Sequence, residues 1–519
     1  MFDVVLRGGS VVDGDGSAPR RAEVGVVGDR IAAIAEPGDF DHIDAREVVE
    51  CRDRLVMPGF VDAHVHGDAL VFDPSAQLAA LAQGVTTFIV GQDGLSFAPA
   101  APHTSRYVSE YFAAVNGTWP TDSPPQSVAD LLSAYDRATP LNVATLVPHG
   151  NVRFDALGAA GVPADPVALK SMRLTLEQGL ADGAVGMSTG LDYVPGRFSD
   201  AAELAALCEV VAAADGVYVT HMRGYESAAP QGMAEVREIA VRSGAAVHVS
   251  HYHGPADVLG ELVDRMLADG IDVSFDSYPY VVGSSILAMA ALPAELQDGG
   301  NEATLNRLAD PRTRAELAVE WFPTKSDELA RTKLSHVGAP AFRWAEGMAL
   351  TAAAEQAGAP VAEFVCELLL AARLDVGAVF RHPPTNSDDE VRALLRHDVQ
   401  LVGSDGIFLG SAPHPRAWGT FARCLATHTR DQRDWSWGDA AAHLAGRAAR
   451  RFGFADRGFA REGLAADLVV LDPARVSDTA TYDNPRQPAT GVDRVYVNGV
   501  LAFNDGSVVS AGCGRALRR

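Results

Sequence analysis

Cysteine is scarce in this sequence, and its pattern excludes two common uses of the residue. The 519 residues contain five scattered cysteines without a C-x-x-C spacing: Cys51, Cys208, Cys366, Cys424 and Cys513. An odd, scattered set does not form a disulfide framework, and the lack of paired spacing argues against a zinc ribbon. We therefore expect these thiols to be buried apolar residues.

Positive charge is also in short supply. The chain has 43 Lys and Arg residues against 67 Asp and Glu residues, which gives a formal charge of −24 at pH 7. A chain of this sign repels phosphate backbones and anionic membrane surfaces. The composition therefore predicts that neither nucleic acid nor a membrane is a partner.

Long hydrophobic runs are missing as well. No run approaches the ~20 apolar residues that a membrane-spanning helix needs. The N-terminal segment MFDVVLRGG has no basic region before an apolar stretch, so it does not look like a secretory signal. We expect a cytoplasmic protein. A chain of 519 residues that is 47% hydrophobic can form one barrel-sized domain and a smaller one.

The main pattern is an alternation of short apolar runs with Ala/Leu/Glu-rich segments of helical period. The apolar runs end at eight polar positions: His64 with His66, Asp93, His149, Ser188, His221, His251, Asp276 with Tyr278, and Asp405. This order predicts an α/β fold, a (β/α)8 TIM-type barrel whose active site lies where the strands end. The run VGAVF at 376–380 leaves a ninth strand open.

The two chain ends and one internal segment depart from this pattern. Residues 1–58 and 456–519 alternate apolar and polar residues between Gly/Asp turns, which is typical of antiparallel strands. We predict that both ends form one small β-sandwich beside a barrel of residues 59–455. Residues 285 to about 350 predict an insertion between barrel strands seven and eight.

A metal site is indicated at the predicted barrel mouth. His64 and His66 are separated by one residue, and residues i and i+2 of a strand face the same side. The other candidates end later strands: Asp93, His221, His251 and Asp405. Four imidazoles and two carboxylates suffice to hold one or two divalent ions that activate water. Six candidates at strand ends favour this interpretation over six unrelated core or surface residues.

Several motifs together resemble one family. They are PGFVDAHVHGD, GVTTFIVGQDGLSFAP, GMSTGLDYVPGRFSD, YVTHMRGYE, VSHYHG, DSYPYVVGSS, VGSDG, HPRAWGTFARCL, DRGFAREGLAADLVVLDP and YDNPRQPATGVDRVYVNG. In this order they resemble the amidohydrolase superfamily and, within it, the D-aminoacylase (N-acyl-D-amino-acid deacylase) family, over nearly the whole chain. The resemblance implies a barrel flanked by a β-sandwich, zinc or another divalent metal that activates water, and hydrolysis of an N-acyl amide bond, with an N-acyl-D-amino acid as the first candidate substrate.

The resemblance also implies roles for the candidate ligands. His221 and His251 resemble ligands of the more tightly held metal, and His64, His66 and Asp405 resemble those of the second position. Asp405 would in addition carry a proton from water to the leaving amine, because a carboxylate beside a cation is ionised. A turn residue is the alternative for Asp405.

The sequence departs from the family at Asp93, where the family has a cysteine between the two glycines of GQDG. A carboxylate can bridge two ions about 3.5–4 Å apart, whereas losing sulfur weakens the preference for soft metals. We expect the second metal site to be better occupied than in the thiolate enzymes. Asp93 as a non-ligating loop residue is the alternative.

One other branch of the superfamily is excluded and a second is disfavoured. Many relatives bridge their metals with a carbamylated lysine, but lysine occurs here only at positions 170, 325 and 333, and none of these ends a predicted barrel strand. The deaminase branch uses a closely spaced glutamate after the histidine of strand five. The residues after His221 are MRGYE, which lack that spacing.

Substrate binding is implied for three residues. By resemblance, Arg416 grips the substrate carboxylate through two parallel N–H donors, while Tyr278 and Ser284 contact the substrate and polarise the scissile carbonyl. A surface ion pair for Arg416 and simple packing for Tyr278 are the alternatives. His253 and His382 are further departures near the mouth.

The small-molecule substrate therefore has competing interpretations. A hydrolase of another linear or cyclic amide, or a catalytically silent scaffold that keeps the barrel, stays open at this point. The number of subunits does not follow from the sequence.

Overall fold

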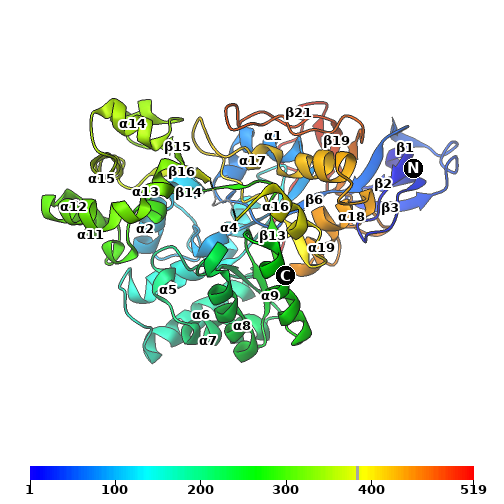
Figure 1. Ribbon diagram of the computed structural model, residues 1–519. Helices are drawn as coiled ribbons and strands as arrows, with labels where there is room; N and C mark the ends of the chain where they lie inside the picture. Colours follow the sequence, from blue (N-terminus) through cyan, green and yellow to red (C-terminus); the bar gives the residue numbers. More distant parts are fainter. Residues whose placement is uncertain (382–384) are drawn as a thin grey trace.

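The computed structural model describes residues 1–381 and 385–519. His382 lies outside the described residues. Figure 1 shows a central barrel with the N-terminal strands at one end and a helical region at the other.

Eight parallel strands make up the barrel. They are β6 (Phe60–Asp62), β7 (Val85–Val90), β8 (Asn142–Thr145) continued by β9 (Val147–Pro148), β10 (Gly186–Gly190), β11 (Val217–His221), β12 (Ala246–Val249), β13 (Val273–Ser277) and β17 (Gln400–Val402). They pair as β6-β7-β8 and as β9-β10-β11-β12-β13-β17. Since β8 and β9 are halves of one strand, the two sheets are continuous on that side.

Backbone hydrogen bonds join the first strand to the last. Ala63 N donates to Val402 O at 3.2 Å, and Asp405 N donates to His64 O at 2.8 Å. His66 N donates to the carbonyl of residue 406 at 3.0 Å. These bonds continue past the short strand ends, so the barrel closes and the predicted (β/α)8 fold is confirmed.

Helices return the chain between the barrel strands. They are α1 (Pro74–Leu81), α2 (Pro102–Tyr111), α3 (Ala113–Asn116), α4 (Val128–Tyr135), α5 (His149–Leu157), α6 (Pro166–Ala181), α7 (Ala201–Ala213), α8 (Ala229–Ser243), α9 (Ala256–Ala268), α16 (Asp388–Leu395), α17 (Arg416–Arg423), α18 (Trp437–Ala441) and α19 (Arg447–Arg451). Asp165 and Asp200 cap the N-termini of α6 and α7, which satisfies otherwise unpaired N–H groups. Gly244, at φ 71°, ends α8 in the left-handed conformation that glycine favours.

A second, antiparallel sheet interrupts the barrel between β13 and β17. It consists of β14 (Val282–Ile286), β16 (Val376–Arg381) and β15 (Thr332–Val337), in that order. Six helices accompany it: α10 (Leu287–Ala291), α11 (Asn301–Ala309), α12 (Pro311–Glu316), α13 (Ser326–Ala330), α14 (Leu350–Ala357) and α15 (Val361–Ala371). The run at 376–380 is therefore a strand of this sheet and not a ninth barrel strand.

The two chain ends meet in one nine-stranded sheet. Its strands are β1 (Phe2–Val11), β2 (Arg20–Val27), β3 (Arg30–Ala35), β4 (Ala45–Glu50), β5 (Leu55–Pro58), β18 (Leu468–Leu471), β19 (Val492–Val497), β20 (Val500–Asn504) and β21 (Ser507–Val508). The ends join where β5 pairs antiparallel with β18. We keep the division at residues 1–58, 59–455 and 456–519 as a proposal.

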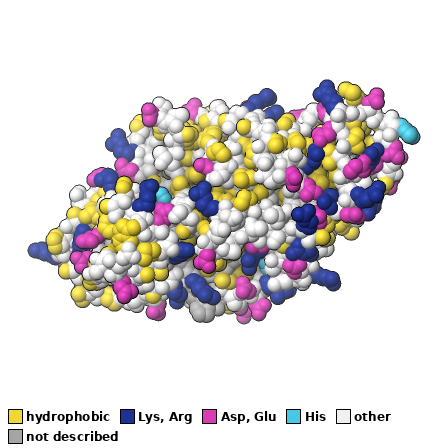
Figure 2. Space-filling model, turned by 90° about the horizontal axis from the view of Figure 1, so that it is seen from above, with side chains coloured by type: hydrophobic (Ala, Val, Ile, Leu, Met, Phe, Trp, Pro, Cys, Tyr) yellow, Lys and Arg dark blue, Asp and Glu magenta, His cyan; other side chains and the backbone are white. Residues whose placement is uncertain are grey.

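The surface mixes charges of both signs. In the face shown in Figure 2, acidic and basic side chains are interspersed among polar and apolar ones. Ion pairs such as Arg237–Asp269, at 2.8 Å, lie on the exposed surface. Within residues 1–381 and 385–519, no helix combines the length and apolar character needed to cross a membrane. All five cysteines are buried, as the sequence predicts.

A buried carboxylate, Asp467, links the terminal sheet to the barrel. Its side chain accepts hydrogen bonds from Arg457, from Asn142 Nδ2 at 3.0 Å and from Asn498 N at 2.6 Å. Its backbone carbonyl accepts from the N–H of Gly59 at 2.8 Å. Since Asn142 begins β8 of the barrel and Asn498 follows β19 of the terminal sheet, this side chain joins both parts of the molecule.

We expect Asp467→Ala to lower the free energy of unfolding by about 3–5 kcal/mol, because Arg457 would lose a buried partner. Denaturant unfolding followed by circular dichroism measures this loss. Asp483, an exposed carboxylate of the same C-terminal region, is the control, and Asp483→Ala should stay within about 0.5 kcal/mol of the parent chain. Equal stability of the two variants would contradict the linking role of Asp467.

Candidate metal centre

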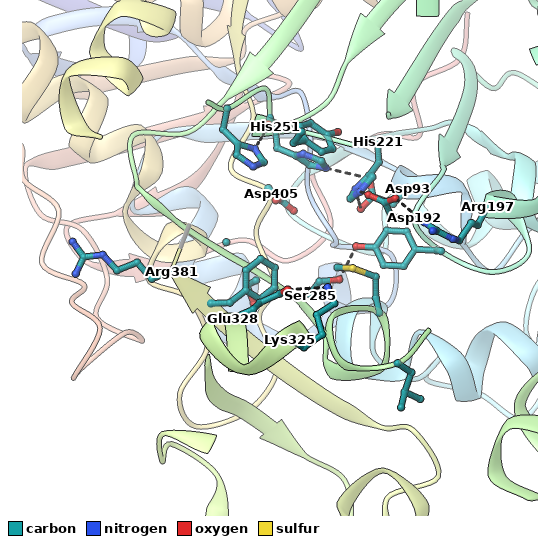
Figure 3. Close-up of a pocket in the computed structure, with 18 of the residues that line it drawn as sticks. Asp93, Asp192, Arg197, His221, His251, Ser285, Lys325, Glu328, Arg381 and Asp405 are labelled. Atoms are coloured by element: carbon teal, nitrogen blue, oxygen red, sulfur yellow. Dashed lines mark hydrogen bonds and ion pairs between the residues drawn. The ribbon is translucent and has the colours of Figure 1, made fainter. Parts of the chain in front are cut away.

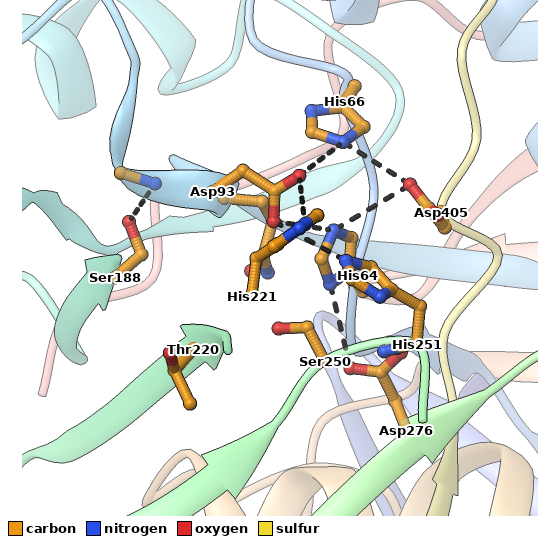
Figure 4. A network of polar contacts seen from close by, with 12 residues as sticks. His64, His66, Asp93, Ser188, Thr220, His221, Ser250, His251, Asp276 and Asp405 are labelled. Atoms are coloured by element: carbon orange, nitrogen blue, oxygen red, sulfur yellow. Dashed lines mark hydrogen bonds and ion pairs between the residues drawn. The ribbon is translucent and has the colours of Figure 1, made fainter. Parts of the chain in front are cut away.

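The six predicted ligands lie together at the C-terminal ends of the barrel strands (Figure 4). Three of them have positive φ: Asp93 at 55°, His251 at 37° and Asp405 at 49°. This conformation is uncommon for residues other than glycine, although Asp and His tolerate it better than most. Such strained residues cluster at functional sites. The chain turns sharply at these three strand ends, and the turns aim the side chains at one point.

Asp93 occupies the middle of the cluster. Its Oδ1 lies 3.6 Å from His64 Nε2 and 3.7 Å from His251 Nε2. Its Oδ2 lies 3.7 Å from His66 Nε2 and 3.6 Å from His221 Nδ1. These separations are long for hydrogen bonds, but they approach the roughly 3.4 Å between two ligand atoms on one tetrahedral zinc ion.

The candidate ligand atoms form two overlapping groups. One consists of His64, Asp93 and His251, and the other of His64, His66 and Asp405, with the ligand atoms of each group within 4.8 Å of one another. His66 Nε2 lies 3.3 Å from Asp405 Oδ1. Since Asp93 also faces His66 and His221, its carboxylate lies where a bridging ligand would be.

Buried polar atoms of the cluster lack ordinary partners. Among the described residues, both nitrogens of His64, Oδ1 of Asp93 and Nδ1 of His221 are buried without a hydrogen bond. An unpaired buried polar group is costly. A cation could pair with His64 Nε2, Asp93 Oδ1 and His221 Nδ1, whereas His64 Nδ1 faces Asp276 Oδ2 at 3.6 Å. Nitrogen and carboxylate donors also match the ligands that zinc prefers. The residues therefore fit a divalent metal.

The electrostatics of the cluster favour positive charge on two of its imidazoles, His64 and His221, whereas burial lowers the pKa of His251. Burial lowers the pKa of His64, but the charges of Asp276 and other nearby carboxylates outweigh burial and raise that pKa to about 9. Burial also opposes protonation of His221, yet Asp93 and its neighbours raise the pKa of His221 to about 10. At neutral pH both imidazoles would hold protons, and a metal that binds there would displace them.

A cavity of about 620 Å³ opens beside the cluster (Figure 3). Asp93, His221, His251 and Asp405 line one side of it, whereas Lys325 and Glu328 of the inserted region lie on another. His64 and His66 are buried behind the cavity. A small molecule in the cavity would therefore meet part of the cluster directly.

The three predicted substrate residues also line this cavity. Arg416 is fully buried, and its Nη1 lies 2.8 Å from Asp405 Oδ2. Its Nη2 donates to Ser284 O at 3.1 Å, and the guanidinium lies 4.7 Å from the ring centre of Tyr278. The alternative prediction of a surface ion pair for Arg416 is therefore wrong, because its ion pair with Asp405 is buried. Ser284 Oγ donates to Ala378 O at 2.9 Å.

The departure at His253 also lies at the cavity. His253 Nδ1–H donates to His251 O at 2.7 Å, and its ring stacks on Tyr225 with 4.8 Å between ring centres. The position follows the His251 turn directly, so His253 extends the wall of the cavity next to the cluster.

Comparison with known proteins identifies the family of this chain. The model of the amidohydrolase family matches residues 47–503. This chain belongs to the amidohydrolase family. The resemblance predicted from the sequence motifs is confirmed.

Curated relatives of this amidohydrolase include two enzymes of Alcaligenes xylosoxydans xylosoxydans. An N-acyl-D-glutamate deacylase is 32% identical over 528 residues, which cover 100% of this chain and 97% of the relative. A D-aminoacylase is 32% identical over 534 residues, which cover 100% of this chain and 98% of the relative.

Solved structures of two similar proteins match over the full length of both chains. A D-aminoacylase superposes with a TM-score of 0.82 and 30% identity, covering 100% of each chain. The N-acyl-D-glutamate deacylase of Bordetella bronchiseptica, complexed with zinc and a phosphonate that mimics the tetrahedral intermediate, superposes with a TM-score of 0.83 and 30% identity, also covering 100% of each chain. The barrel architecture is thus common to this amidohydrolase and to both of these enzymes.

Sequence reasoning missed two residues that lie within hydrogen-bond distance of the imidazoles. Asn116 Oδ1 lies 3.2 Å from His66 Nδ1, and Asp192 Oδ2 lies 3.1 Å from His221 Nε2. Asp276 was recognised only as a strand end. Asn116 ends a short helix far from any strand end, so no local pattern marks it. Asp192 follows a strand end by two residues, which is the only signal that could have found it.

We expect Asp93→Ala to weaken zinc binding at least about tenfold, because the carboxylate faces all four imidazoles of the cluster. Elemental analysis after dialysis against a chelator gives the metal retained per chain. Asp93→Cys is the matched variant: a thiolate should retain one soft metal while lowering occupancy of the second position. If Asp93→Ala retains as much metal as the parent chain, Asp93 is not a ligand.

Proposed function

We propose that this chain hydrolyses N-acyl-D-amino acids to a carboxylate and a D-amino acid. The observation that carries the proposal is the buried Asp405–Arg416 pair, 2.8 Å apart, at the inner wall of a cavity that also exposes Asp93, His221 and His251. The full-length similarity to deacylases of N-acyl-D-amino acids supports the same substrate class.

A divalent metal, most simply zinc, would be held by His64, His66, Asp93, His221, His251 and Asp405. When bound it would act as a Lewis acid that polarises the scissile carbonyl and makes water more acidic. Zinc in the complex of the Bordetella bronchiseptica enzyme supports this choice of ion.

Asp405 would act as the proton carrier. Burial raises its pKa, but Arg416 and the hydrogen bond from His66 outweigh burial and lower that pKa to about 2. The carboxylate is therefore ionised at neutral pH and can accept a proton from the attacking water. It then gives the proton to the leaving nitrogen as the C–N bond breaks, so the products are a carboxylate and a free amine.

Arg416 would bind the substrate carboxylate. Among the described residues its Nε and Nη1 atoms are buried without a hydrogen bond, although Nη1 lies within ion-pair distance of Asp405. The Nε–H and the adjacent Nη2–H of a guanidinium form one edge with two parallel donors, and this edge matches the two oxygens of a carboxylate. The same residue would thereby hold the substrate beside Asp405.

Tyr278 would supply the hydroxyl that polarises the scissile carbonyl. The hydroxyl of Ser284 already donates to Ala378 O, so its proton is engaged, whereas its lone pairs can still accept from the substrate. Burial raises the pKa of Tyr278, which keeps the phenol protonated and able to donate.

The partners follow from the same chemistry. The substrate is a small anionic molecule, and nucleic acid is not proposed as a partner because the chain carries a formal charge of −24. A cytoplasmic location remains part of the proposal.

Asp405→Asn is expected to lower kcat by about 10²–10⁴, because an amide cannot carry the proton. Metal content should stay close to that of the parent chain, since the amide oxygen can still ligate. The thermal midpoint should fall, because Arg416 loses a buried charged partner. The assay follows amine release from N-acetyl-D- and N-acetyl-L-amino acids. Unimpaired turnover of Asp405→Asn would remove this residue from the mechanism.

Arg416→Lys should raise KM for N-acetyl-D-amino acids by about 10–100-fold, because lysine cannot form two parallel hydrogen bonds. The matched substrate is the corresponding N-acetyl-D-amino-acid amide. It has no carboxylate, so its KM should change little. If the parent chain cleaves amides without a carboxylate equally well, the enzyme acts on another class of amide.

A further inference from the structure

His221 differs from the other imidazoles of the cluster in the nitrogen that it presents. His64, His66 and His251 face the Asp93 carboxylate through Nε2. His221 faces Asp93 Oδ2 through Nδ1, at 3.6 Å. A neutral imidazole has one protonated nitrogen and one lone pair, and only the lone pair can bind a metal. His221 must therefore carry its proton on Nε2.

Asp192 lies where it can hold that proton. Its Oδ2 is 3.1 Å from His221 Nε2, which is a hydrogen-bond distance. The Nδ1 atom of the same ring is buried and, within residues 1–381 and 385–519, has no hydrogen-bond partner. One nitrogen of His221 is thus engaged by a carboxylate while the other is free for a ligand.

The register of the barrel brings Asp192 to this place. Gly190, the last residue of β10, pairs with His221, the last residue of β11. The next residue, Leu191, donates its N–H to His221 O at 2.9 Å. Asp192 is the next residue, so its side chain lies beside the imidazole at the end of the neighbouring strand.

The turn that carries Asp192 is also packed against the Asp93 turn. A Cβ on Gly190 would lie 2.2 Å from Asp93 O, and a Cβ on Gly94 would lie 2.8 Å from Gly190 N. Such close backbone contact requires glycine at both positions. The carboxylate of Asp192 is therefore held in a fixed position relative to two candidate ligands, Asp93 and His221.

A neighbouring arginine and two tyrosine rings further restrict the positions of the Asp192 and His221 side chains. Arg197 Nη1 lies 3.2 Å from Asp192 Oδ1, so the two carboxylate oxygens have different partners. Tyr193 and Tyr225 meet the His221 ring edge to face, with 5.1 Å and 5.2 Å between ring centres. Figure 3 shows Asp192 between His221 and Arg197 at the cavity wall.

We propose that Asp192 is a positioning residue that fixes His221 as an Nδ1 ligand of the metal centre. The proposal rests on the metal-dependent function proposed above. A carboxylate on the second nitrogen of a ligating imidazole sets its tautomer and raises its basicity, and loss of such a partner costs about 10–100-fold in metal affinity.

The test is zinc affinity, measured by titration of the metal-free full-length chain against a competing chelator. Asp192→Ala should weaken zinc binding by about 10–100-fold. Asp192→Asn should weaken it less, because the amide oxygen still accepts from Nε2–H. This graded order separates a role in orienting His221 from simple loss of folding, which the thermal midpoint of each variant reports.

Glu328→Ala is the matched control. Glu328 is another carboxylate of the same cavity, but it pairs with Lys325 Nζ at 2.9 Å. This variant should bind zinc like the parent chain. A loss as large as that of Asp192→Ala would mean that zinc responds only to the charge of the cavity, and would overturn the proposal.

Cobalt(II) substitution gives a readout that does not depend on activity. The visible absorption bands of bound Co²⁺ report the ligands and geometry at the ion, so Asp192→Ala should shift them and Glu328→Ala should not. Identical bands and identical zinc affinity in Asp192→Ala and the parent chain would overturn the proposal.

The same experiment separates this proposal from the proposed function. If the parent chain binds zinc tightly and Asp192→Ala binds it weakly, the positioning role is supported even if no N-acyl-D-amino acid is cleaved. If the parent chain releases D-amino acids and Asp192→Ala binds zinc equally well, the function stands and the positioning role is wrong. A parent chain that binds no metal overturns both.

Discussion

The carboxylate of Asp93 faces four imidazoles at 3.6–3.7 Å, and the rest of the site depends on this contact. Buried imidazoles from different strands would be costly to bring together unless negative charge lies between them. The turn that carries this charge packs backbone to backbone against the end of β10, where Gly94 and Gly190 leave no room for a Cβ. The electrostatics of the cluster therefore depend on the local backbone geometry that positions Asp93.

The barrel and the inserted region contribute different parts of the site. All six candidate ligands come from the ends of barrel strands, which a closed ring of hydrogen bonds holds in register. Ser284, Lys325 and Glu328 come from the inserted region that includes β14, β15 and β16. Fixed ligands on a rigid barrel and cavity walls on a separate unit allow the substrate to vary while the metal chemistry stays the same.

Arg416 and Asp405 couple the two parts. Their 2.8 Å contact is buried, and Arg416 also bonds to the backbone of β14 through Ser284 O. Removing one partner of such a pair leaves an uncompensated buried charge. The pair therefore contributes both to the position of the inserted sheet and to the charge state of the proposed proton carrier.

The sequence by itself determined the fold and the ligand types. Eight apolar runs with polar endings predict the barrel, and the one-residue spacing of His64 and His66 places both on one face, because these patterns depend only on local periodicity. Tertiary structure alone decided that β16 joins a separate antiparallel sheet, that Arg416 is buried against Asp405, and that Asn116 and Asp192 lie within hydrogen-bond distance of two imidazoles. The contacts join residues that are 50 positions apart for Asn116 and His66, 29 for Asp192 and His221, and 11 for Arg416 and Asp405. Such pairings arise from strand register and turn packing, which no local pattern records.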